Sequence, residues 1–220
     1  MSDLNFLKLI YELGGFLHTV SNGDIAKKSQ LSNASVTERT KSIAKNTDLL
    51  SYKRYYGTQL TQKGIDLLKP YIQQQRLIEI WLVKEMDYSL GECHKEADIL
   101  STAVSAHFIK KLNTYLDYPK FCPHGNVIPN NSKTIKRIPL TLTDELKKDQ
   151  KYIIQSFAED NYILGLLETV DIKLNDIIEV LNVIEGMVVI YNSRTKTKQL
   201  LPEILANSIR ITEKSNIIVE

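Results

Sequence analysis

Apolar residues recur at helical spacing through the first half of the chain, with polar capping residues between the helical stretches. A first helix is expected to end at the Gly14-Gly15 pair. Ser21 and Ser32 are placed as N-caps of two further helices, the second over about residues 34–45. Two helices joined by so tight a connection indicate a helix-turn-helix.

A small hairpin is expected next, with strands over residues 50–56 and 59–61 joined near Gly57-Thr58. A helix, a helix-turn-helix and a hairpin in this order are typical of a winged helix. The chain therefore begins with a predicted winged helix-turn-helix domain over residues 1–70.

A wide apolar stripe predicts a long helix from residue 63 to about 86, with Pro70 either kinking it or lying near its first turn. A Ser89-x-x-Glu92 capping box predicts a helix over residues 90–100, and another follows over 106–118. The segment that follows it, residues 119–141, holds four of the six prolines, which indicates a loop and then a linker. We assign residues 71–129 to a helical domain and 130–150 to the linker.

Strand patterns dominate the C-terminal part of the chain. They cover residues 152–157, 176–184, 187–192 and 208–212, and one helix is expected over about 160–169. About seventy residues with four or five short strands suit a small β-barrel, which we assign to residues 151–220. The predicted fold class is α+β, mainly α.

Composition and charge narrow the class of protein. The 220 residues are 43% hydrophobic and 25% charged, which excludes a disordered chain. Only two cysteines occur, Cys93 and Cys122, which fits a reducing compartment, and no stretch is long and apolar enough for a membrane span. We expect a cytoplasmic protein. Lys and Arg outnumber Asp and Glu by ten to six in residues 1–75, so a polyanion is expected to meet that part.

The helix-turn-helix provides the first candidate chemistry, because the N-terminal side chains of its second helix can reach base edges in a major groove while the hairpin holds phosphates. The alternative is a solvated helical face on a protein-interaction module. The candidate DNA-binding residues are Ser32, Ser35, Thr37, Glu38, Arg39, Lys41, Lys53 and Arg54.

A set of side chains that can bind a metal ion provides the second candidate chemistry. Cys122 and His124 are two residues apart, and His94 and Asp98 share one helical face, with Glu79 on the preceding helix. Thiolate, imidazole and carboxylate suit Zn²⁺ or Fe²⁺. The alternative is that the thiol is merely buried and the imidazoles satisfy backbone groups. No catalytic motif is present, so neither an enzyme nor a small-molecule substrate is expected.

Several strings together resemble the diphtheria-toxin-repressor-like metalloregulators, most closely the manganese-responsive branch. They are IYELGG, LTQKG, RLIEIWLV, ECHKEADIL and YPKFCPHGNVIP. The resemblance implies a winged helix, a helical dimerisation domain that holds metal, and a C-terminal FeoA-type β-barrel.

The resemblance also implies two metal sites. The ligands of one correspond to Glu79, Cys122, His124 and Asp160 or its neighbour Glu159, with His94 a ligand in some members. The other site is degenerate here, since only Asp98 keeps a ligand type. The remaining positions of that site are occupied by Asn5, Ser101 and Thr102.

The resulting expectation is a homodimeric repressor that binds a palindromic double-stranded operator and controls metal homeostasis genes in response to Zn²⁺, Fe²⁺ or Mn²⁺. The dimer interface is expected at Leu77, Ile80 and Trp81. The alternatives are a metal-independent regulator that has lost its primary site, or a metal-binding or protein-interaction module that does not bind DNA.

Overall fold

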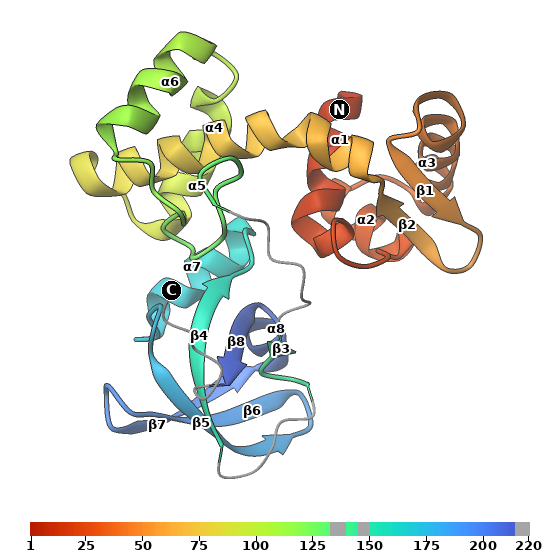
Figure 1. The fold of residues 1–220 in the computed structure, drawn as a ribbon. Coiled ribbons are helices and arrows are strands. Elements are labelled where there is room, and N and C mark those ends of the chain that lie inside the picture. The colour runs from red at the N-terminus through yellow and green to blue at the C-terminus, as the bar shows by residue number, and fades with distance from the viewer. Residues whose placement is uncertain (133–139, 145–149, 214–220) are drawn as a thin grey trace. The chain divides into compact units, whose positions relative to one another are not determined.

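The computed structural model describes residues 1–132, 140–144 and 150–213 and divides the chain into two compact units (Figure 1). Unit 1 holds residues 1–73, and unit 2 holds the described residues from 74 onward. The elements of unit 1 are α1 (Asp3–Ile10), the π-helical turn η1 (Tyr11–Gly15), α2 (Asn22–Ser29), α3 (Asn33–Thr47), β1 (Leu50–Lys53), β2 (Gly57–Leu60) and the start of α4 (Gln62–Met86).

Serine N-caps start α1, α2 and α3 of unit 1. The side chains of Ser2, Ser21 and Ser32 each accept a hydrogen bond from a backbone N–H in the first turn of α1, α2 and α3. The apolar faces of these helices pack into one core with the hairpin and the start of α4. The predicted helix-turn-helix is confirmed.

The hairpin differs from the prediction in its turn. Lys53 pairs with Gly57, so the turn is residues 54–56, and Gly57 and Thr58 belong to β2. Thr58 exchanges two backbone hydrogen bonds of 2.7 and 2.8 Å with Val20. A Cβ on Gly57, whose φ is +111°, would overlap the Val20 carbonyl. Glycine is therefore needed here for close approach to Val20 rather than for the turn.

Unit 2 begins with the second part of α4, followed by α5 (Leu90–Leu100) and α6 (Ala106–Tyr115). Pro70 lies inside α4 rather than near its first turn. The capping box of Ser89 and Glu92 is present at the start of α5. Helix α6 ends three residues before the prediction, because Tyr118 and its predecessor adopt positive φ angles.

The rest of unit 2 is an antiparallel sheet in the order β3-β8-β4-β5-β6-β7, with α7 and α8 contributing to its core. Its strands and helices are β3 (Leu140–Thr141), β4 (Lys151–Phe157), α7 (Asn161–Thr169), β5 (Ile177–Ile184), β6 (Met187–Asn192), β7 (Thr197–Pro202), α8 (Glu203–Ala206) and β8 (Ile209–Glu213). The sequence patterns missed β3 and β7, which are the two edge strands. The predicted linker lies largely outside the described residues. Within the described ranges, no helix has the length and apolarity to cross a membrane.

Candidate metal centre

Two helices of unit 2 contribute a buried carboxylate and an imidazole. Glu79 lies in the second half of α4 with none of its surface exposed, and His94 lies near the start of α5. The His94 Nδ1 is 2.6 Å from the Glu79 Oε1. The contact joins α4 to α5 and fixes one oxygen of Glu79.

The loop after α6 contributes a thiol and a second imidazole to the same cluster as Glu79. The Gly125 N–H donates to the Cys122 carbonyl and closes a tight turn, in which the Cys122 Sγ lies 3.7 Å from the His124 Nδ1. Gly125 has a φ of +80°, and a Cβ there would overlap the Gln155 carbonyl oxygen of β4. Only glycine lets the loop approach β4 this closely.

The connection between β4 and α7 supplies Glu159 rather than its neighbour Asp160. The Glu159 Oε1 lies 3.6 Å from the Cys122 Sγ. The Asp160 carboxylate instead caps α7 and accepts hydrogen bonds from the Tyr162 and Ile163 N–H groups. The structure therefore brings Glu159, and not Asp160, to the other candidate ligands.

Glu79, Cys122, His124 and Glu159 each place one ligand atom within 4.8 Å of the other three, and all four are buried. No other group of three or more His, Cys, Asp or Glu side chains with this geometry occurs among the described residues. The Glu79 Oε2 has no hydrogen-bond donor in the described part of the chain, although the His124 Nδ1 lies 3.4 Å away. A buried carboxylate oxygen without a donor is costly, and a cation would relieve that cost. These residues fit a transition metal.

His124 is oriented for coordination by its Nδ1. Its Nε2 lies 3.0 Å from the Leu90 carbonyl oxygen, which has no proton to give, so the Nε2 carries the proton in the neutral tautomer. The Nδ1 lone pair then faces the carboxylates and the thiol. A backbone carbonyl that holds the second nitrogen of a ligand histidine is a common support at metal sites.

Burial and the neighbouring charges shift the pKa values of the cluster's ligands. Burial raises the pKa of the Cys122 thiol to about 11, and the negative charge of Glu79 adds to this effect. For His124, burial alone would lower the pKa, but the Glu79 charge outweighs it and holds the pKa well above the usual range. Burial would raise the pKa of Glu159, but Arg76 lowers it below the usual range.

Arg76, which sequence reasoning missed, is the permanent cation of the cluster. Its Nε and Nη2 lie 3.0 and 2.9 Å from the two oxygens of Glu159, and both side chains are buried. With two carboxylates and a thiolate as donors, a divalent ion and Arg76 together balance the negative charge. The available signal was its position three residues before Glu79, on the same face of α4.

The residues of the second site implied by the resemblance are used differently. The Ser101 hydroxyl donates to the Asp98 carbonyl at 3.0 Å, and the Thr102 hydroxyl donates to the Ile99 carbonyl at 2.8 Å. Asn5 belongs to unit 1, where its N–H is capped by Ser2. Hydroxyls bound to backbone in this way are poor ligands for a divalent ion.

Most of the candidate DNA-binding residues are exposed on unit 1. They are Ser32, Ser35, Glu38, Lys41, Lys53 and Arg54. Thr37 is partly buried, with its hydroxyl 2.8 Å from the Asn22 amide nitrogen. Arg39 turns away from them and bonds to Asp3 at 2.7 Å.

Two of the three predicted interface residues are already buried within the chain. Leu77 and Ile80 are 0% and 4% exposed and belong to the core that α4, α5 and α6 share. Trp81 is partly exposed, and its ring meets that of Phe108 edge-on at 6.3 Å. Trp81 therefore is the one of the three with side-chain surface left for a partner.

Comparisons with known protein families, solved structures and curated proteins all find transcriptional regulators. Residues 61–130 match the family model "Iron dependent repressor, metal binding and dimerisation domain". The chain is 30% identical to ScaR, solved with bound Zn²⁺, over 96% of this chain and 99% of that one, with a TM-score of 0.79. It is 29% identical to the manganese regulator SloR over 97% of this chain and 100% of that one, with a TM-score of 0.78.

A curated relative extends the similarity. This protein of Methanocaldococcus jannaschii, named "Uncharacterized HTH-type transcriptional regulator MJ0568", is 24% identical over 98 residues, which are 44% of this chain and 78% of its own length. The near-complete coverage of the solved structures confirms the predicted fold class. The chain thus belongs to the diphtheria-toxin-repressor-like family of metal-dependent transcriptional regulators, which are not enzymes.

Proposed function

We propose that this protein represses transcription from a duplex operator when a divalent transition metal binds Glu79, Cys122, His124 and Glu159. The observation that carries the proposal is the buried Glu79 Oε2, which accepts no hydrogen bond within the described residues and lies beside a thiol, an imidazole and a second carboxylate. His94 supports the site by holding the other Glu79 oxygen. Thiolate and imidazole favour Zn²⁺ or Fe²⁺ over Mn²⁺ on ligand chemistry.

DNA recognition is proposed for the exposed face of α3 and for the hairpin of unit 1. Lys41, Lys53 and Arg54 are exposed cations on that surface, and they would neutralise phosphates while the N-terminal side chains of α3 reach base edges. Two copies related by a two-fold axis would meet a palindromic operator. Trp81 and the 38%-exposed Phe108 are the apolar side chains we assign to the contact between copies. A cytoplasmic location follows from contact with the operator.

The test begins with metal content and oligomeric state. Elemental analysis should find one transition metal per chain, and light scattering should find a dimer. Duplexes selected from a randomised pool by the metal-loaded protein then serve as operators. Their affinity should fall on chelation and return with Zn²⁺, Fe²⁺ or Mn²⁺ added singly, which also ranks the three metals.

Two variants make the test specific. His124→Ala should bind the selected duplexes weakly at every metal concentration, whereas Asp98→Ala, on the neighbouring helix, should respond to metal as the native protein does. A pool that yields no enriched duplex, or an affinity that chelator leaves unchanged, would contradict the proposal.

A further inference from the structure

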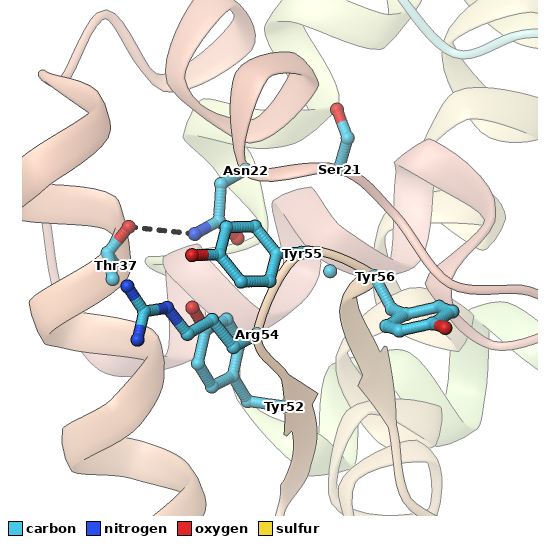
Figure 2. A pocket seen from close by; sticks show the side chains of 8 residues that line it. Ser21, Asn22, Thr37, Tyr52, Arg54, Tyr55 and Tyr56 are labelled. Atoms are coloured by element: carbon cyan, nitrogen blue, oxygen red, sulfur yellow. Dashed lines mark hydrogen bonds between the residues drawn. The ribbon is translucent and has the colours of Figure 1, made fainter.

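A concave surface, here called the wing notch, lies between α3 and the tip of the hairpin in unit 1 (Figure 2). Its volume is about 330 Å³, and its lining includes Asn22, Thr37, Tyr52, Arg54 and Tyr55. None of the side chains that line it is acidic. The lining thus combines a cation and hydroxyls with aromatic rings.

The walls of the notch are fixed before any ligand arrives. The Asn22 amide donates to the Thr37 hydroxyl at 2.8 Å and joins α2 to α3. The two backbone hydrogen bonds between Thr58 and Val20 hold the hairpin against the start of α2. A site whose walls are already bonded to each other loses little conformational freedom on binding.

Tyr55 at the tip is strained and gains no burial in return. Its φ is +67°, a region that asparagine and glycine occupy more readily, and 89% of its surface is exposed. The Arg54 guanidinium lies 4.9 Å from the centre of its ring. Figure 2 shows Arg54 and Tyr55 extending toward the helix that carries Thr37, while Tyr56 extends away from it. Strain without a packing gain is typical of residues that contact a ligand.

The polar groups of the notch select an anion flanked by an apolar surface. The Ser21 hydroxyl at the rim already donates to Asp24 at 2.6 Å, and the Thr37 hydroxyl donates to the Asn33 carbonyl at 2.8 Å. The donors of the notch include the Arg54 guanidinium and the phenol hydroxyls of Tyr52 and Tyr55. A phosphodiester with its deoxyribose offers both features, since the phosphate oxygens accept hydrogen bonds and the sugar presents a face to a ring.

We infer that the wing notch clamps one sugar-phosphate segment of the duplex, with Arg54 and the Tyr55 hydroxyl at the phosphate and the Tyr55 ring against the sugar. The inference rests on the proposed DNA-binding function. It assigns to the notch a share of affinity that is independent of base sequence, because neither a phosphate nor a deoxyribose identifies its base.

Three variants and a control test the clamp. Tyr55→Asn should keep or raise the melting temperature because it relieves strain, yet weaken binding to a duplex about tenfold, as expected for a lost hydrogen bond to a charged group. Tyr55→Phe should lose affinity through the hydroxyl alone. Arg54→Ala should reduce the slope of log affinity against log salt by about 0.9, whereas Tyr55→Asn should leave that slope unchanged. Tyr162→Ala, which changes an exposed tyrosine of unit 2, should match the native protein.

The outcomes separate the clamp from the proposed function. The losses should be equal for a selected operator and for a duplex of scrambled sequence. Native affinity in Tyr55→Asn and Arg54→Ala, or losses confined to the selected operator, would overturn the clamp and leave DNA binding intact. A native protein that binds no duplex at any metal concentration would overturn both.

Discussion

The guanidinium of Arg39 lies 2.7 Å from the carboxylate of Asp3, so a side chain expected to read DNA instead ties α3 to α1. Arg39 also donates to the Met1 carbonyl at 2.8 Å, and its guanidinium lies 4.9 Å from the centre of the Phe6 ring. These contacts anchor the start of α1 against α3. Arg39 thus acts in folding unit 1.

Arg39→Ala should therefore lower stability without changing which duplexes are selected. Its ion pair is partly exposed, at 24% for Arg39 and 68% for Asp3, and together with the contact to Phe6 should contribute about 1 kcal/mol. Denaturant unfolding of Arg39→Ala, Asp3→Ala and the double variant measures the coupling between them. If Arg39→Ala changed the base preference of the selected duplexes, Arg39 would have to contact DNA, which would contradict this structural role.

Removing Cys122 and His124 together should abolish stoichiometric metal binding, because a thiolate and an imidazole are lost from a four-donor cluster. Asp98→Ala should keep one metal per chain, since the hydroxyls around it are bonded to backbone carbonyls. Elemental analysis after gel filtration measures both. Two metals per native chain, or a metal lost with Asp98, would show that the second site is functional.

Arg76→Met should destabilise the metal-free protein by about 3–5 kcal/mol, because it leaves the buried Glu159 charge without its partner. Adding Glu159→Gln to that variant should recover part of the loss. Because the folded protein lowers the pKa of Glu159, this carboxylate stabilises the native fold when the pH is above 4.5, the usual pKa of a glutamate. That stabilisation is lost progressively as the pH falls below 4.5 and Glu159 takes up a proton. Acid unfolding should accordingly depend less on pH in Arg76→Met than in the native protein. Equal acid profiles would contradict this role.

Metal affinity should rise with pH through the neutral range. With a thiol pKa of about 11, Cys122 holds a proton in the metal-free protein, and binding must displace it. Each displaced proton makes affinity increase about tenfold per pH unit. Titrations at several pH values measure the slope, and Cys122→Ser should reduce it. A slope that this substitution leaves unaltered would mean that the thiol does not bind the ion.

Local signals predicted much of this fold. The Ser21 and Ser32 caps and the capping box of Ser89 mark helix starts that depend on a few neighbouring residues, so sequence alone suffices for them. The turn of the hairpin was misplaced because Gly57 serves a contact with Val20, thirty-seven positions away in the chain. A long-range contact leaves no local pattern.

In the candidate metal site, too, some residues could be predicted from the sequence and others depend on long-range contacts. Glu79, Cys122 and His124 follow from ligand type and resemblance, but the choice of Glu159 over Asp160 depends on which carboxylate caps α7. Arg76 escaped notice because an arginine on a helix is ordinarily a surface residue, and only its pairing with a glutamate eighty-three positions away accounts for its burial.

Gly125 has a consequence for how relatives of this protein are compared. The packing of its loop against β4 excludes a side chain there, whether or not an ion is bound nearby. Packing therefore constrains Gly125, whereas His124 beside it is constrained only by the metal binding proposed above. A lineage that abandoned metal sensing would be free to change the histidine but would still keep the glycine. A glycine at this position in a distant sequence is thus evidence of a shared fold. Only the metal-ligand side chains beside it indicate whether that protein can still bind the metal.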